Sequence, residues 1–172
     1  AAAGSLAWLA MEKIKFGKPS VLGIVTGMVA GLGTITPASG FVGPGGALII
    51  GLAAGTCCFF ATQYLKRVLQ IDDSLDVFPV HGVGGMLGTF LVGIFASAGL
   101  GVFSGQGYAE DMAMGSQLGV QLTGIIATVA YTAVLTFMVL KVVGAILGLR
   151  VNEEVENKGL DLVLHEEKGY DL

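Results

Sequence analysis

The sequence carries little charge. Only 13% of its 172 residues are Asp, Glu, Lys or Arg, against roughly 25% in typical soluble domains. Hydrophobic residues make up 53% of the chain, and its mean hydropathy is +0.79. This composition argues against an ordinary soluble domain and indicates an integral membrane protein. The formal net charge of −4 is not that of a nucleic-acid-binding protein, which needs a basic surface.

Cysteine and histidine are also scarce. Cys57 and Cys58 are neighbours in an apolar run, a spacing that fits neither a disulfide framework nor a zinc site, so we expect both to pack as small hydrophobic residues. His81 has no second His, Cys or acidic residue at ligand spacing within its apolar segment. His165 lies in a charged tail, where we expect it to be solvated or to pack within the tail. Since no nucleophile motif is present either, we expect no metal, no cofactor and no enzyme activity.

Apolar segments fill most of the chain. It begins with "AAAGSLAWLAM", without a signal peptide, and this stretch resembles the second half of a transmembrane helix, so we expect a fragment that lacks an upstream portion. Four longer apolar segments follow, at about 19–36, 45–65, 76–98 and 117–147. Each is long enough to cross a bilayer, and lipid leaves helices as the only option for such segments. The last segment is longer than a bilayer requires and should tilt or project from it.

Glycine is abundant, with 28 residues in the chain. Within the apolar segments it recurs at every fourth position, in three stripes: Gly23, Gly27 and Gly31; Gly51 and Gly55; Gly84 and Gly88. Small residues at this spacing let helix backbones approach closely in lipid. The pattern predicts a compact helical bundle.

Lysine and arginine are absent from two of the connectors, "PASGFVGPGG" and "GVFSGQGYAEDMAMGS". All nine basic residues lie in the other two connectors or from residue 141 onward. Because basic loops favour the cytoplasmic side, we expect a multi-pass protein of the cell membrane with a cytoplasmic C-terminus. Ser104 should then be accessible from outside the cell, and Asn152 only from inside.

His81 stands alone in an apolar helix with a polar entrance, "QIDDSLDVFPVHG". Asp73 and Asp76 can accept hydrogen bonds from free N–H groups at the helix start, and we expect at least one to be a cap. With Asp76 as the cap, Pro79 lies where no donor is lost, whereas with Asp73 one bond is lost and a kink follows. A histidine at membrane depth indicates a functional group facing the bundle interior, near Val77. Spacing alone equally allows a packed histidine that is hydrogen-bonded to a neighbouring helix.

Longer stretches of the sequence resemble one family. "DDSLDVFPVHGVGGMLGT" is similar to the tenth transmembrane helix of the ammonium transporter (Amt/Mep/Rh) family. "TGMVAGLGTITPASGFVGPGGALIIG" resembles its eighth and ninth helices, and "QLTGIIATVAYTAVLTFMVLKVVGAILGLRVNEEVENKGLD" resembles its eleventh helix and cytoplasmic tail. The resemblance covers essentially the whole chain in order and is greatest to the bacterial and archaeal Amt branch.

The resemblance implies an all-α integral membrane fold, with about four full transmembrane helices plus the stub of one. These would form the second half of an eleven-helix channel with inverted repeats, assembled as a homotrimer in the lipid membrane. Its substrate would be ammonium or ammonia, with NH3 conducted (net NH4+) through a hydrophobic pore. His81 matches the second member of the family's twin-histidine pair, and Val77 and Val29 match apolar pore-wall positions. Thr36 matches a threonine near the upstream aspartate, and Asp73 matches the repeat-related partner of that aspartate.

The C-terminal stretch resembles the family's regulatory tail. We expect a transmembrane domain over residues 1–150 and a cytoplasmic tail over 151–172. The resemblance implies that the tail, including Gly148, Arg150, Gly159 and Asp161, packs under the pore and contributes to a surface for a PII signalling protein. Composition alone would instead suggest a disordered acidic end. An ammonium sensor and an unrelated membrane protein with a packed His81 stay open as alternatives.

Overall fold

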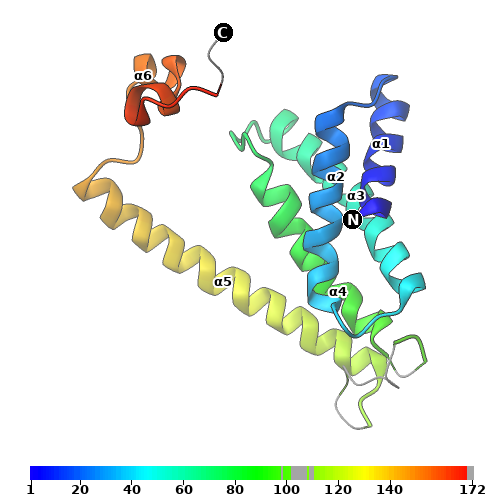
Figure 1. The fold of residues 1–172 in the computed structure, drawn as a ribbon. Helices are drawn as coiled ribbons and strands as arrows, with labels where there is room; N and C mark the ends of the chain where they lie inside the picture. Colours follow the sequence, from blue (N-terminus) through cyan, green and yellow to red (C-terminus); the bar gives the residue numbers. More distant parts are fainter. Residues whose placement is uncertain (98, 102–107, 109–110, 170–172) are drawn as a thin grey trace. The chain divides into compact units, whose positions relative to one another are not determined.

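The structure is a computed structural model that describes residues 1–97, 99–101, 108 and 111–169. The described residues form α-helices joined by short turns and 3-10 or π-helical segments (Figure 1). The α-helices are α1 (Ala2–Phe16), α2 (Val21–Ile35), α3 (Pro44–Arg67), α4 (Gly84–Phe95), α5 (Met114–Ile146) and α6 (Glu153–Lys158). The other segments are η1 (Thr36–Ala38), η2 (Phe78–Val83) and η4 (Asp161–His165). In this part of the chain β-pairing is limited to an isolated bridge between Val42 and Gly101, so the all-α prediction is confirmed.

Four helical segments are long and apolar enough to cross a membrane: Val21–Ala38, Pro44–Arg67, Phe78–Phe95 and Met114–Ile146. They match the four predicted spans, and α1 matches the shorter stub. Helix α1 continues beyond Met11, the last residue of the predicted apolar stub, to Phe16. The loss of hydropathy after Met11 does not end the helix. Gly17 ends it with a φ of 80°, and the Gly17 N–H donates to the Lys13 carbonyl.

The chain divides into two compact units, Ala1–Ile126 and Ala127–Leu172. In the first unit, small residues allow α1, α2, α3 and α4 to pack closely. A Cβ atom added at Gly27 would lie 2.5 Å from Cβ of Trp8, and one added at Gly55 or Gly88 would collide with the backbone carbonyl of Gly4 or Thr34. The glycine stripes therefore lie where helices meet, as the sequence predicts.

Two hydrophobic clusters hold the first unit together. One consists of Trp8, Ala30, Cys58, Phe59 and Val80, and the other of Ala38, Ile50, Val92 and Ala96. Cys58 is fully buried in the first cluster, which fits the expected packing role. Its neighbour Cys57 is exposed within this chain.

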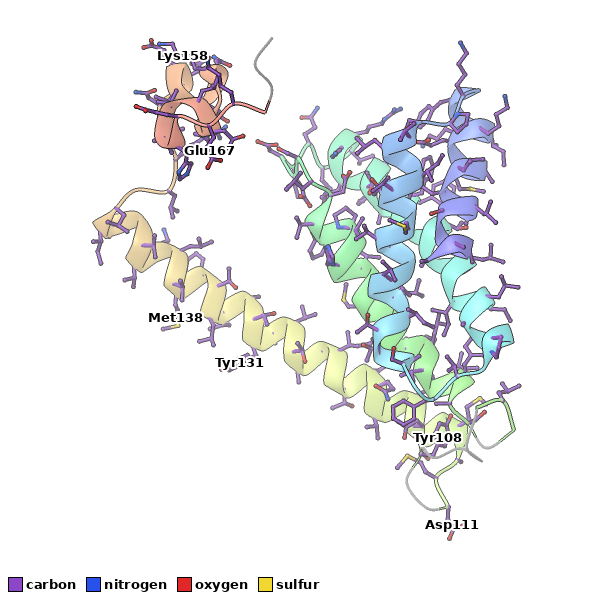
Figure 2. The ribbon with its side chains drawn as sticks, viewed as in Figure 1. Tyr108, Asp111, Tyr131, Met138, Lys158 and Glu167 are labelled. Carbon is purple, nitrogen blue, oxygen red and sulfur yellow. The ribbon has the colours of Figure 1, made fainter. Side chains whose placement is uncertain are left out.

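The second unit holds the later turns of α5, followed by α6 and η4. Side chains such as Tyr131 and Met138 are exposed along α5 (Figure 2). Residues 151–169 contain two short helices where composition alone would suggest disorder. The two units meet inside α5 because they are distinguished by how densely their residues pack. The division into a transmembrane domain (1–150) and a tail (151–172) stays a prediction. Ser104, named above for its accessibility, lies outside the described residues.

Candidate functional site

The helix that carries His81 begins with a turn made by two aspartates. The Asp76 carbonyl accepts the first bond of this turn, from the Val80 N–H at 3.0 Å, directly before Val77, the N-cap of η2. Pro79 then falls within the first turn, where no intrahelical donor is lost. The Asp73 carboxylate accepts from the N–H groups of Val77, at 2.9 Å, and Phe78, at 2.8 Å. Asp76 thus provides a backbone acceptor at the helix start, and Asp73 provides the side-chain acceptor.

Asp76 also links this turn to the preceding helix. Its Oδ1 atom lies 2.8 Å from Nζ of Lys66 in the last turn of α3. The contact is an ion pair between the Asp76 carboxylate and the Lys66 ammonium, with the carboxylate the more shielded from water of the two. Asp76 has a φ of 55°, a left-handed conformation that Asp adopts more readily than most residues. Sequence reasoning missed this pair, although both residues flank the same predicted connector.

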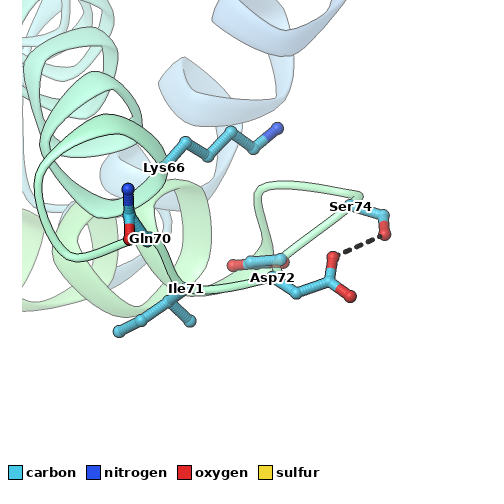
Figure 3. A pocket seen from close by; sticks show the side chains of 6 residues that line it. Lys66, Gln70, Ile71, Asp72 and Ser74 are labelled. Carbon is cyan, nitrogen blue, oxygen red and sulfur yellow. Dashed lines mark hydrogen bonds between the residues drawn. The ribbon is translucent and has the colours of Figure 1, made fainter.

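An open pocket lies beside the ion pair (Figure 3). Its lining residues are Lys66, Gln70, Ile71, Asp72, Asp73 and Ser74. Within it the Ser74 hydroxyl donates a long hydrogen bond of 3.4 Å to Oδ1 of Asp72. The polar end of this helix pair is therefore open to water, while the helix beyond it is apolar.

His81 lies in η2, a segment of π-helix that continues into α4. π-helical turns are rare and often occur at functional sites because they widen the helix locally. Pro79 is fully buried at the start of this segment. The sequence predicts a helix here with a possible kink, and the structure shows a change of helix type.

The His81 imidazole is next to α2, beside Gly33. A Cβ atom added at Gly33 would lie 3.8 Å from Nδ1 of His81. His81 is exposed within this chain, and its interior position in the full protein stays a prediction. Among the described residues it has no hydrogen-bond partner, and Val77, one turn earlier, is 53% exposed.

The predicted pore residues Val29, in α2, and Thr36, the first residue of η1, flank the same glycine. Val29 precedes Gly33 by four positions and Thr36 follows it by three, which places all three on one face of the helix. Val29 is partly buried against the Trp8 cluster. Thr36 is exposed at the end of α2, and its hydroxyl donates to the Leu32 carbonyl at 2.7 Å. The structure thus brings His81 of η2 next to the α2 face that carries Val29 and Thr36.

The tail residues form a small structure of their own. Gly148 and Gly159 have φ angles of 78° and 93°, which favour glycine. Arg150 donates to both carboxylate oxygens of Glu156, from Nε at 3.1 Å and from Nη2 at 2.6 Å. The hydrogen bonds and charge of Arg150 lower the pKa of Glu156. Asp161 begins η4, and its backbone carbonyl accepts from the Glu167 N–H.

This arrangement offers one kind of chemistry. Within the part of the chain that the structure describes, no group of three His, Cys, Asp or Glu side chains could hold a metal ion. The reactive feature is an imidazole on an apolar helix face. It can donate a hydrogen bond from one ring nitrogen and accept one at the other.

Comparison with known proteins gives consistent matches. A family model described as Ammonium Transporter Family matches residues 1–170. A putative ammonium transporter of Methanothermobacter thermautotrophicus is 44% identical over 100% of this chain and 42% of its own length. An ammonium transporter of Aquifex aeolicus is 45% identical over 98% of this chain and 38% of its own length. The chain spans about two-fifths of the length of these relatives.

Solved structures agree in fold. A structure described as "Sensor Amt Protein" has a TM-score of 0.84 and 30% identity, over 95% of this chain and 39% of its own. The crystal structure of Saccharomyces cerevisiae Mep2 has a TM-score of 0.76 and 37% identity, over 89% of this chain and 35% of its own.

Proposed function

The chain belongs to the ammonium transporter family, and from this premise we propose that the full protein conducts ammonia across the cell membrane through a pore lined by His81. The transported species would be NH3, with net uptake of ammonium as a nitrogen source. The helical membrane fold and the family model over residues 1–170 support transport of ammonium in general. The pore and the conducted species are the finer part of the proposal.

One observation carries the proposal: the imidazole of His81 is exposed on an apolar helix that is long enough to span a membrane. A polar side chain at this depth is costly in lipid and is generally found facing a bundle interior or a cavity. Gly33 leaves room beside it, where a bulkier residue would approach the ring. In the full protein, we propose, the open side of His81 faces a narrow pore completed by other segments.

The chemistry suits ammonia better than the ammonium ion. Moving a bare cation into a narrow apolar passage costs far more than moving a neutral amine. Val77 and Val29 would line such a passage and provide no group to replace the water around an ion. The neutral imidazole of His81 can donate to NH3 or accept from it, and can relay a proton. A second pore histidine, the twin of His81, would belong to the other half of an inverted repeat.

Assembly and control are part of the same proposal. The full protein would be a homotrimer with a cytoplasmic C-terminus, and residues 148–162 would form part of the surface that a PII protein contacts. The ordered turns around Arg150 and Glu156 support a defined surface at this point. An ammonium sensor stays a second candidate because of its similar structure.

The experiment uses the full-length protein in liposomes. An inward ammonium gradient should produce a current or an internal pH change, and His81→Ala should reduce it about tenfold or more, as loss of a proton-relaying group does. His165→Ala removes the other histidine of this chain and should leave transport unchanged. Wild-type transport in His81→Ala would contradict the pore role. Binding without transport in the unmodified protein would favour a sensor.

A further inference from the structure

Two cations near the ends of α1 and α3 lie against phenylalanine rings. Nζ of Lys15 is 5.9 Å from the ring centroid of Phe16, 5.7 Å from that of Phe59 and 5.9 Å from that of Phe60. The guanidinium carbon of Arg67 is 5.0 Å from the centroid of Phe16. These distances lie within the range of cation–π attraction. The Phe16 ring therefore brings together two positive charges from different helices.

The rings form a fixed support that extends from the core to the surface. Phe59 is 1% exposed and packs edge-on against Trp8, with ring centroids 5.5 Å apart. It also contacts Phe60 at 5.5 Å and Phe16 at 6.0 Å, and these two rings are 51% and 43% exposed. Because the buried ring anchors the exposed ones, the two cations are held in place before any ligand arrives.

Neither cation has a carboxylate partner among the described residues. The nearby acidic groups are already engaged: Glu12 accepts from Ser20, Asp72 from Ser74, Asp73 from the backbone of Val77 and Phe78, and Asp76 pairs with Lys66. Lys15 and Arg67 are both exposed. The cluster therefore offers two uncompensated charges to an anion.

The position of the cluster identifies the kind of anion. The span α3 ends at Arg67, and α1 ends at Phe16. On α3, Phe60, Tyr64 and Arg67 follow one another at helical spacing, so that apolar rings lead up to a charge. Tyr64 is of a residue type enriched at the level of lipid headgroups, and basic clusters between transmembrane helices bind anionic headgroups.

We propose that Lys15 and Arg67, supported by Phe16 and Phe60, form a binding site for the phosphate of an anionic phospholipid. The headgroup phosphate would lie between the ammonium and the guanidinium, and an acyl chain would lie along the exposed rings. The site rests on the membrane location of these helices. It does not require that the protein conduct ammonia.

The experiment measures lipid binding to the full-length protein in neutral detergent micelles, by native mass spectrometry. Phosphatidylglycerol should bind more tightly than phosphatidylcholine, and the double variant Lys15→Gln, Arg67→Gln should lose about tenfold in phosphatidylglycerol affinity. The control variant Lys13→Gln, Lys18→Gln removes the same amount of charge from the connector that holds Lys15, but neither lysine contacts a ring. It should change the affinity less than about threefold, because only long-range attraction is lost.

A second variant separates the rings from the charges. Phe16→Leu, Phe60→Leu keeps apolar volume and both cations but removes the ring faces, so it should weaken phosphatidylglycerol binding by a smaller factor. Size-exclusion chromatography and circular dichroism show whether each variant keeps its fold and assembly. Liposome transport is measured separately, so loss of the proposed conduction leaves the lipid result interpretable.

Three outcomes would overturn the lipid site. Equal losses in the two charge variants would mean diffuse attraction and no site. Displacement of phosphatidylglycerol by millimolar inorganic phosphate would indicate a simple anion site. Dissociation of the assembly by Lys15→Gln, Arg67→Gln, with lipid affinity unchanged, would assign the cluster to a contact between protein segments.

Discussion

The Asp73 carboxylate accepts a hydrogen bond from the Phe78 N–H at 2.8 Å, across the turn that starts the His81 helix. A second bond, from the Val77 N–H, reaches its other oxygen at 2.9 Å. Two of the free donors at the helix start are thereby satisfied by one side chain. Asp73, eight residues before His81, therefore stabilises the start of the His81 helix, whatever its role in transport.

Replacement of Asp73 should therefore weaken the helix start. Asp73→Ala removes both acceptors and should lower the free energy of unfolding by about 0.5–2 kcal/mol, the usual cost of a lost cap. Asp73→Asn keeps one acceptor oxygen and should cost less. Thermal unfolding of the purified full-length protein, followed by size-exclusion fluorescence, measures both. If the two variants lose the same stability, the charge of Asp73 matters and its capping bonds do not.

A pair of glycines in α4 tests the close approach of α2 and α4. At Gly88 an added Cβ atom would collide with the backbone of Thr34, which cannot move aside as a side chain can. Gly88→Ala should therefore cost about 1–3 kcal/mol of stability, as overpacking does in other cores. At Gly85 nothing lies within 4 Å of the added atom. Gly85→Ala is the matched control and should leave stability the same or slightly higher.

The elements whose signals are local were predictable from the sequence. Hydropathy and length predicted the four spans, and the glycine stripes lie at helix contacts. The capping chemistry of Asp73 and Asp76 was also visible, although the sequence allowed either residue and the structure uses both. The spans and caps depend on neighbours only a few residues away, and the glycine stripes follow a spacing of four residues that is visible in the sequence.

Features that depend on contacts between different helices and turns were not predictable from the sequence. The Lys66–Asp76 pair, the contact of Lys15 with the Phe59 ring and the contact of Arg67 with the Phe16 ring join different elements, and no periodicity marks them. The π-helical turn around His81 has no clear sequence signal beyond Pro79. His81 is exposed within this chain, and its predicted interior position depends on segments of the full protein that the sequence of this chain cannot describe.

The tail should respond to acid through Glu156. Its pKa is lowered in the folded chain by the Arg150 hydrogen bonds and charge. A lowered pKa means that the pairing stabilises the tail above the unfolded pKa, near 4.3, and that this support is lost as pH falls through the folded value. The protection of residues 150–158 against amide hydrogen exchange should therefore fall in acid, an extra acid sensitivity that remains after correction for the slower chemical exchange at low pH. Glu156→Gln should abolish this extra acid sensitivity, whereas Glu167→Gln, which leaves the Arg150 pair intact, should keep it.

Orientation in the membrane can be tested with two serines at opposite ends of α3. Ser39 lies in the connector without basic residues, Ser74 lies in the connector after Lys66 and Arg67, and both are exposed. Since basic connectors favour the cytoplasmic side, Ser39→Cys should react with a membrane-impermeant maleimide in intact cells. Ser74→Cys should react only after the membrane is opened. Cys57 and Cys58 are first replaced by Ala, and this background should show no labelling. Both substitutions replace one small exposed hydroxyl with a thiol, so a difference in labelling reports the side of the membrane. Labelling of Ser74→Cys in intact cells, with Ser39→Cys protected, would place the C-terminus outside and exclude the proposed PII contact.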